Sequence, residues 1–327
     1  MAERTVQVPA EVDRIVAVGP GALRLVCHLG VGSDVVAVEH QERATDNWTP
    51  PYNIAYPEFR ELPTAGPQHG GDAEAIVTQA PDLIVASTDT PDGSAQLQSQ
   101  TGVPTVWVDQ GNFGDDRESL YTAWRTVAEA VGRTERAEEL VSFVESRRQE
   151  LQELSSDAVG HPSTFVGAVS HRGGQAMTST EVPFPPFSMV GAESVAIELA
   201  PKAAESTGST AKRDVASEKL LEWDPEVVFI NRANLSIVQD GLRGSGLDSL
   251  SAVRNGAVYG VHPHYYYDYN PSTMLANAYY IGTILYPAAF GDVDPKTAAD
   301  RVYRGFFDQD LYERMADAHG PYGAVEL

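Results

Sequence analysis

Cysteine is almost missing from this sequence of 327 residues, in which Cys27 is the only one. A single thiol excludes an internal disulfide, a zinc site held by cysteines and an iron–sulfur cluster, because each of these needs more than one sulfur. Cys27 lies in the apolar stretch 23–27. We therefore expect it to fill space in the core.

Long apolar runs are missing as well. No segment reaches the ~18 consecutive apolar residues that indicate a membrane-spanning helix. The first four residues, 1–4, have neither the basic nor the apolar region of a secretory signal. We expect no membrane span in this sequence, and we expect that an exported form has lost its signal.

Positive charge is scarce, because 23 basic residues stand against 46 acidic ones and give a net charge of −23. Such a charge repels nucleic acid and anionic lipid, which excludes a general polyanion-binding role and nucleic acid as a partner. A strongly acidic surface is typical of salt-adapted proteins. We expect a halophilic source, with plain solubility as the alternative interpretation.

Four common enzyme signatures are missing: Gly-x-Ser-x-Gly, a P-loop, His-Glu-x-x-His and a Cys–His pair. A partial dinucleotide fingerprint does occur, because Gly19-Pro20-Gly21 follows a predicted strand and Glu39 lies about 20 residues further on. Arg24 stands where the third small residue should be, and this disfavours an NAD-dependent oxidoreductase. The turn remains a candidate ligand contact at a helix N-terminus, or a simple tight turn.

Short apolar runs alternate with helical patterns in two parts of the chain. The alternation predicts parallel sheets covered by helices, and so an α/β fold. The predicted strands are 14–18, 35–39, 83–86, 105–108, 164–169, 227–230 and 257–261. The predicted helices outside the middle of the chain are 21–30, 72–80, 96–101, 192–199, 217–223, 247–253, 272–285 and 295–306.

The middle of the chain has a helical pattern only. Apolar stripes over 120–131 and 137–154 predict two helices, the second of about 22 residues and ~33 Å long. We expect this helix to be a rigid strut between two lobes. The predicted domains are an N-terminal α/β lobe, a helical segment and a C-terminal α/β lobe, over 1–118, 119–157 and 158–327.

The two predicted lobes share a motif. Residues 74–85 align without a gap with residues 218–229, and both read as a helix, a proline, an acid and a buried strand. The matching position of the motif in each lobe favours duplication over chance. A duplicated lobe on a strut predicts a ligand cleft between the lobes.

These features together resemble the class III periplasmic binding proteins, which serve ABC importers of ferric siderophores, haem and cobalamin. The segments that carry the resemblance are 12–17, 76–85, 188–196, 220–229 and, most similar to archaeal binding proteins usually assigned to iron, 265–294. The resemblance implies two Rossmann-like lobes joined by a long rigid helix, with no catalysis. It also implies an extracytoplasmic, membrane-anchored lipoprotein in the native form.

The resemblance further implies a partner and a cargo. Glu74 and Glu218 match the surface glutamates with which such proteins dock on arginines of an ABC permease dimer; the alternative is two solvated helix residues. No cofactor is expected, and the favoured ligand is an iron chelate. A corrinoid, haem or a directly bound metal ion are alternatives, although Gln68 and Ser87 stand where corrinoid binders have tryptophans.

Loops that leave the carboxyl ends of the strands are expected to line the cleft. The candidate ligand-binding residues are Pro20, Gly21, His40, Gln41, Tyr52, Gln68, His69, Ser87, Thr88, Arg172, Thr178, Tyr265, Tyr266, Tyr267 and Tyr269. For Arg172, contact with a carboxylate or catecholate and a turn-anchoring surface role are both open.

The segment 262–270 stands out, because it holds four tyrosines and two histidines directly after a predicted strand. Phenol and imidazole groups suit ferric iron, and tyrosine rings stack on planar ligands. His264, Tyr265 and Tyr267 are the candidate metal ligands. Core packing is the alternative role for the run, and if it is extended at most every second tyrosine faces the ligand.

Overall fold

Two parallel sheets organise the chain, as expected from the alternation of strands and helices. The computed structural model describes residues 4–43, 49–88, 90–111, 113–114, 116–170, 175–200 and 211–327. The chain divides into two compact units, each with its own sheet. The first is Met1–Val144, Tyr266–Asn270 and Gly305–Gln309, and the second is Glu145–Tyr265, Pro271–Arg304 and Asp310–Leu327.

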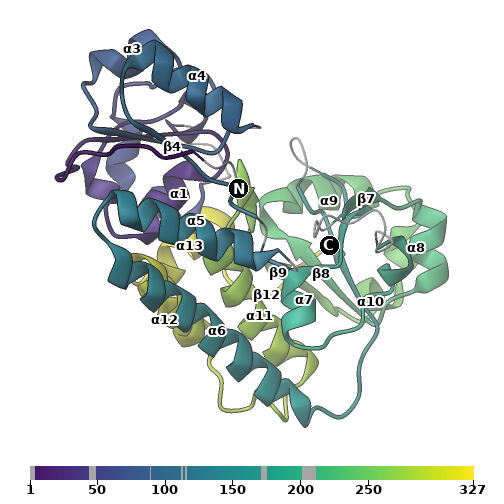
Figure 1. Ribbon diagram of the computed structural model, residues 1–327. Helices are drawn as coiled ribbons and strands as arrows, with labels where there is room; N and C mark the ends of the chain where they lie inside the picture. The colour runs from purple at the N-terminus through teal and green to yellow at the C-terminus, as the bar shows by residue number, and fades with distance from the viewer. Residues whose placement is uncertain are drawn as a thin grey trace. The chain divides into compact units, whose positions relative to one another are not determined.

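The sheet of the first unit has the order β2-β1-β3-β4, and all its pairings are parallel. Figure 1 labels its edge strand β4. Its strands are β1 (Ile15–Val18), β2 (Val35–Ala37), β3 (Leu83–Ala86) and β4 (Thr105–Trp107). The helices of this unit are α1 (Ala22–His28), α2 (Pro51–Ala55), α3 (Ala73–Thr78), α4 (Pro91–Thr101) and α5 (Arg117–Ala130). Parallel strands buried on both faces explain why they read as continuous apolar runs.

The sheet of the second unit has the order β12-β9-β8-β5, in which only the short edge strand β12 is antiparallel. Its strands are β5 (Thr164–Gly167), β8 (Val227–Asn231), β9 (Val258–Val261) and β12 (Gly323–Ala324). A separate antiparallel hairpin pairs β6 (Ser179–Val182) with β7 (Ala211–Asp214). The helices are α7 (Pro185–Met189), α8 (Ser217–Trp223), α9 (Leu235–Leu242), α10 (Ser251–Arg254), α11 (Pro271–Leu285) and α13 (Tyr312–His319).

Two helices run from one unit into the other: α6 (Thr134–Ser156) and α12 (Pro295–Phe307). The expected long helix is confirmed, because α6 is continuous over 23 residues. Glu150 of α6 accepts a hydrogen bond from Arg301 of α12 at 2.7 Å. In the first unit, Arg136 of α6 donates to the Gly305 carbonyl at 2.8 Å.

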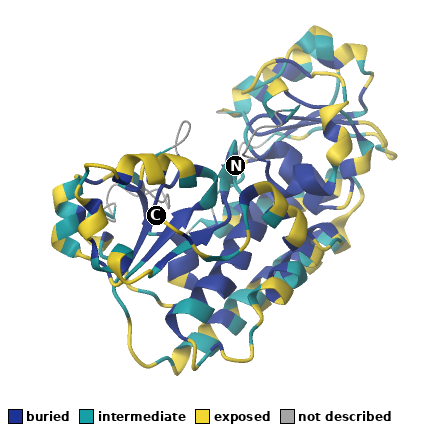
Figure 2. Ribbon diagram, turned by 180° about the vertical axis from the view of Figure 1, so that it is seen from behind, coloured by how far each residue is buried: buried dark blue, intermediate teal, exposed yellow. Residues whose placement is uncertain are grey.

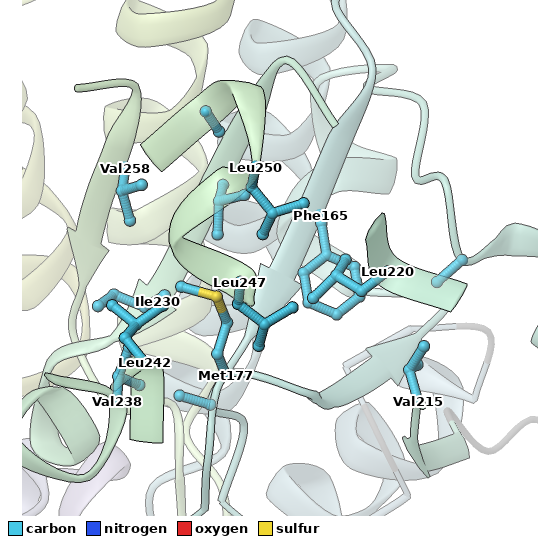
Figure 3. Packing of buried hydrophobic residues seen from close by; sticks show 14 of the residues in the cluster. Phe165, Met177, Val215, Leu220, Ile230, Val238, Leu242, Leu247, Leu250 and Val258 are labelled. Atoms are coloured by element: carbon cyan, nitrogen blue, oxygen red, sulfur yellow. The ribbon is translucent and has the colours of Figure 1, made fainter. Parts of the chain in front are cut away.

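Each unit has its own apolar core (Figures 2 and 3). In the second unit, Phe165 and Ile230 of the sheet pack with Leu220 of α8 and Leu247 of the loop before α10. Burial of each such side chain stabilises the fold by roughly 1.5–3 kcal/mol. Helix α11 is buried nearly all round, as expected for an apolar helix without a polar face.

The predicted duplication reappears in the geometry of the two units. Helix α3 leads into β3 and α8 leads into β8, and the aligned residues Ala80 and Asp224 both have positive φ, of 45° and 39°. The aligned acids, Asp82 and Glu226, each accept a hydrogen bond from a backbone N–H. Asp82 accepts the Arg14 N–H at 3.0 Å, and Glu226 accepts the Ser163 N–H at 2.8 Å.

The predicted helix over 192–199 is wrong, because only a 3-10 turn, Ile197–Leu199, forms there. The helix expected over 96–101 begins earlier, at Pro91, where the Thr90 hydroxyl caps it by accepting the Gly93 N–H at 3.3 Å. The β6–β7 hairpin was not predicted. Its strands are short, and their pairing joins segments about 30 residues apart.

Candidate ligand-binding site

Several predicted site residues meet at the carboxyl edge of the first sheet, where open α/β sheets bind ligands. Residues 19–21 follow β1, residues 39–41 follow β2 and residues 87–88 follow β3. The segment Tyr266–Asn270 also belongs to this unit, although its neighbours in the chain on both sides belong to the second unit.

The tyrosine run forms a tight hairpin of β10 (Tyr265–Tyr266) and β11 (Asp268–Tyr269). Tyr267 lies between the two strands with φ 57°, in the left-handed region, so the run is not continuously extended. The Tyr266 hydroxyl donates to the Gln41 carbonyl at 2.7 Å, and the Gln41 side-chain amide donates back to it at 3.3 Å. The structure thus brings two predicted site residues together.

Tyr267 is tied to two loops of the first sheet. Its hydroxyl donates to Glu39 at 2.9 Å and accepts the backbone N–H of His69 at 2.6 Å. The His69 ring meets the Tyr267 ring edge-on, with 5.3 Å between centroids. Burial and the adjacent Glu39 raise the pKa of the Tyr267 hydroxyl, so it remains protonated.

Glu39, considered from the sequence only as the acid of a dinucleotide fingerprint, connects these loops in the structure. Its carboxylate is 1% exposed and accepts the N–H groups of Gly19, Gly70 and Gly71 at 2.9, 2.9 and 3.1 Å. Burial raises its pKa, and these hydrogen bonds together with that of Tyr267 oppose the rise. An acid at the end of a buried strand, in a chain with glycine-rich loops, was the available signal.

Glu42 lies one turn further on and is completely enclosed. The Tyr52 hydroxyl donates to it at 2.8 Å, and its other oxygen has no hydrogen-bond partner in the described part of the chain. Burial, aided by nearby Glu39, raises the pKa of Glu42 to about 8, against the lowering effect of the Tyr52 bond. Tyr52, a predicted ligand residue, is itself only 1% exposed. Its hydroxyl is therefore bonded to Glu42 inside the protein and is not presented to a ligand.

A buried arginine places a positive charge among the acidic side chains at this edge of the sheet. Arg24 of α1, which occupies the third fingerprint position, contacts Asp268 of the hairpin at 3.5 Å and Gln110 at 3.4 Å. Gly21 is needed beside it, because a Cβ there would lie 1.9 Å from Gln110 and the residue has φ 74°. The contact between Arg24 and Asp268 joins the hairpin to α1.

The other predicted residues of the first unit are spread along this edge. The Ser87 hydroxyl donates to the Pro20 carbonyl at 2.6 Å, which joins the loops after β1 and β3. The Thr88 carbonyl accepts the Trp107 indole N–H at 2.9 Å. His40 and Gln68 are exposed.

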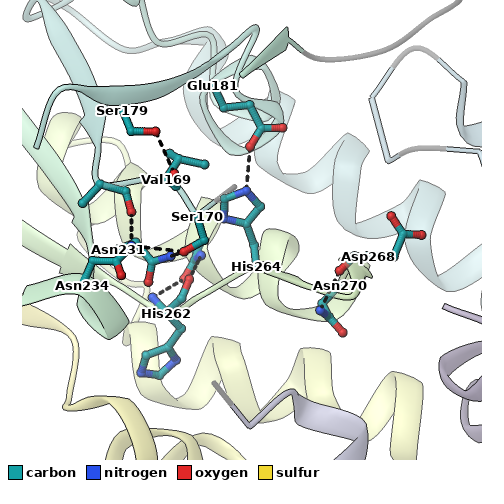
Figure 4. A network of polar contacts seen from close by, with 12 residues as sticks. Val169, Ser170, Ser179, Glu181, Asn231, Asn234, His262, His264, Asp268 and Asn270 are labelled. Atoms are coloured by element: carbon teal, nitrogen blue, oxygen red, sulfur yellow. Dashed lines mark hydrogen bonds and ion pairs between the residues drawn. The ribbon is translucent and has the colours of Figure 1, made fainter. Parts of the chain in front are cut away.

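At the carboxyl edge of the second sheet, the structure shows a buried polar network (Figure 4). The side-chain amides of Asn231 and Asn234 both donate to the Ser170 hydroxyl at 3.1 Å. His264, a candidate metal ligand, is 1% exposed and its Nε2 lies 2.7 Å from the carboxylate of Glu181 in β6.

The remaining predicted residues lie in both units. Thr178 is half-buried, and its carbonyl accepts the Val215 N–H at 3.0 Å. The Lys212 ammonium lies 3.0 Å from the centre of the Tyr265 ring. Tyr269 is half-buried in β11 of the first unit. Arg172 lies outside the described residues.

Glu74 and Glu218, the predicted docking residues, are both exposed in the first turns of α3 and α8. They therefore occupy equivalent positions in the duplicated motif. In the described ranges, no group of three or more His, Cys, Asp or Glu side chains is arranged to hold a metal ion. No helix of the described residues is both long and apolar enough to cross a membrane.

A cavity of about 710 Å³ lies elsewhere in the first unit, along the edge strand β4. It is lined by the segment 4–8, by β4 and by one side of α5. None of the predicted ligand-binding residues lines it. Its size alone does not outweigh the convergence of loops and tyrosines at the carboxyl edge.

A family model for periplasmic binding proteins matches residues 15–265, which is more than half of the chain. The chain belongs to the periplasmic binding protein family. Family membership confirms that it is a binding protein and not an enzyme. The two parallel α/β units likewise match the fold of this family.

One relative and several solved structures are similar to this chain. The molybdate-binding protein MolA of Haemophilus influenzae is 20% identical over 319 residues, covering 93% of this chain and 89% of its own. Its molybdate-bound structure has a TM-score of 0.70 at 17% identity, covering 94% and 96% of the two chains.

An ABC transporter solute-binding protein from Sulfurospirillum deleyianum has a TM-score of 0.69 at 21% identity, covering 97% of both chains. A periplasmic haem-binding protein from Pseudomonas aeruginosa has a TM-score of 0.59 at 18% identity, covering 85% of this chain and 94% of its own. At these identities, the likeness establishes the fold of this periplasmic binding protein and leaves its cargo open.

Proposed function

We propose that this protein is the extracytoplasmic solute-binding component of an ABC importer and that its cargo is an iron chelate. Family membership and the ABC transporters named for its relatives support the first part. The tyrosine hairpin supports the second. Its rings lie half-buried beside the loops of Gln41 and His69, where aromatic faces can stack on a chelator.

The contacts of the three candidate metal ligands favour a chelate over a bare ion. His264 is paired with Glu181, and the Tyr267 hydroxyl already donates to Glu39. Lys212 places a positive charge over the Tyr265 ring, which opposes a second cation there. In a chelate, the small molecule supplies the ligands of the iron, and the protein needs only rings and hydrogen bonds.

An oxyanion is the second candidate, because the relative MolA binds molybdate and matches 93% of the chain. Backbone N–H groups of loops at a sheet edge are the usual donors for such an anion. Here the N–H groups of Gly19, Gly70 and Gly71 already serve Glu39. This internal carboxylate disfavours a dianion at the same place.

Glu74 and Glu218 are proposed to dock on the permease. Their exposure and their equivalent positions in α3 and α8 support the assignment, because two equivalent charges can register a duplicated protein on a two-fold partner.

Titration followed by the fluorescence of the four tryptophans tests the cargo. The probes are a ferric hydroxamate, haemin, cyanocobalamin, molybdate and free ferric or nickel ions, with the iron-free hydroxamate as control. We expect saturable binding of the ferric hydroxamate and much weaker binding of its iron-free form. Tighter binding of molybdate than of any chelate would replace the iron assignment by the oxyanion one.

A further inference from the structure

The Glu39 carboxylate accepts four hydrogen bonds from described residues. Three backbone N–H groups, from Gly19, Gly70 and Gly71, and the Tyr267 hydroxyl all point at its two oxygens at 2.9–3.1 Å. A carboxylate satisfies four donors, whereas a carboxamide would turn an NH₂ group toward at least one of them. The position therefore requires an anion rather than any polar side chain of the same shape.

The four donors come from three separate segments of the first unit. Gly19 lies in the loop after β1, Gly70 and Gly71 precede α3, and Tyr267 is the turn of the tyrosine hairpin. Glu39 itself follows β2. One buried carboxylate thus connects both glycine loops to the hairpin, through charge-assisted bonds that are roughly twice as strong as neutral ones.

The hairpin turn needs this anchor. Tyr267 and His69 both have left-handed backbones, with φ 57° and 70°, a conformation unfavourable for residues other than glycine. The His69 N–H donates to the Tyr267 hydroxyl, and this hydroxyl in turn donates to the Glu39 carboxylate. The Tyr266–Gln41 bonds and the Arg24–Asp268 contact hold the strands of the hairpin, whereas the Glu39 carboxylate holds its turn residue, Tyr267.

We propose that Glu39 is a positioning residue for ligand binding: it fixes the tyrosine hairpin against the glycine loops without touching the ligand. Its 1% exposure keeps the carboxylate away from any solute. The inference about affinity rests on the proposed function, whereas the anchoring itself does not.

Hydrogen exchange of Glu39→Gln and Tyr267→Phe, singly and together, tests the anchor without any ligand. In each single variant, amides of residues 69–71 and 266–270 should exchange at least about tenfold faster, the effect of losing a bond to a charged group. Amides of β3 should be unchanged. The double variant should be no faster than Glu39→Gln, because both changes break the same connection. Glu61→Gln, an exposed acid of the same unit, is the control.

Uniformly faster exchange over the whole first unit would show that Glu39 supports the fold in general and would overturn the proposal. Additive effects in the double variant would show that Glu39 and Tyr267 act independently, and would overturn it too. Unchanged exchange in both segments would overturn it as well.

Binding of a ferric hydroxamate gives the second readout. Glu39→Gln should weaken it by about tenfold or more, again without a further loss in the double variant. Wild-type affinity in Glu39→Gln would refute the positioning role even if the hairpin loosens. If the wild-type protein itself fails to bind, the cargo assignment fails, and the exchange experiment still decides whether Glu39 is the anchor.

Discussion

At the scale of single residues, burial decides the chemistry of the acids near the tyrosine hairpin. Glu39 and Glu42 lie three positions apart and are equally enclosed, each 1% exposed. Glu39 faces four donors, whereas Glu42 receives one hydrogen bond, from Tyr52, and its pKa rises to about 8. Glu42 is therefore protonated at neutral pH.

This difference predicts a pH dependence of stability. The folded state keeps the Glu42 proton up to about pH 8, whereas the unfolded chain loses it near the ordinary value of 4.5. Between these values the folded state binds more protons, so the free energy of unfolding falls as pH rises, by roughly 1.4 kcal/mol per pH unit. Glu42→Gln keeps an acceptor for Tyr52 and should remove this fall.

Urea unfolding of the wild type and of Glu42→Gln, measured at several pH values between about 4.5 and 8, gives the free energy of unfolding across this range. Both proteins share the buried histidines, His28 and His262, whose lowered pKa values reduce stability on the acid side, so the difference between the curves isolates Glu42. Glu61→Gln should follow the wild type. A constant difference across the window would contradict a neutral Glu42.

Not all of these residues could be predicted from the sequence. The tyrosine run after a predicted strand pointed to Tyr266, and the loop after the predicted strand 35–39 pointed to Gln41. The anchor at Glu39 was not predictable, because Tyr267 lies 228 positions away in the chain and the left-handed turn there depends on tertiary contacts. Tyr52 was assigned to the ligand because local sequence does not reveal complete burial.

At the scale of elements, the duplicated helix–strand motif was the most readable feature. Proline after a short helix and an acid before an apolar strand specify the same turn twice, with Ala80 and Asp224 in left-handed conformations. The β6–β7 hairpin had no comparable signal, because strand pairing between distant segments leaves no local pattern.

Helix α3 carries the first copy of the motif and begins with an Asp72 cap. The Asp72 carboxylate accepts the Ala75 N–H at 2.8 Å. Asp72→Ala should lower the free energy of unfolding by about 1 kcal/mol, whereas Asp72→Asn, which keeps a capping oxygen, should cost much less. Chemical unfolding of the two variants measures this. Equal losses would mean that the cap contributes through charge alone.

At the scale of the whole molecule, capture of the solute and delivery to a permease are separable. Glu74 and Glu218 are exposed on α3 and α8, and neither belongs to the predicted ligand-binding residues. Glu74→Arg and Glu218→Arg should leave the affinity for a ferric hydroxamate unchanged and impair uptake in cells that carry the cognate importer. Exposed ion pairs contribute only ~0.2–1 kcal/mol each, so full loss should need both changes.

Uptake that stays normal in the double variant would remove the docking assignment. A loss of solute affinity in either single variant would instead place that glutamate near the ligand.

The central claim is that solute binds at the carboxyl edge of the first sheet, against the tyrosine hairpin. Hydrogen exchange with and without saturating ferric hydroxamate tests it most directly. The account predicts slower exchange at residues 39–41, 68–71 and 266–270, with little change in the β4–α5 segment that lines the separate cavity. Protection confined to that cavity, with the hairpin and its loops unaffected, would contradict it.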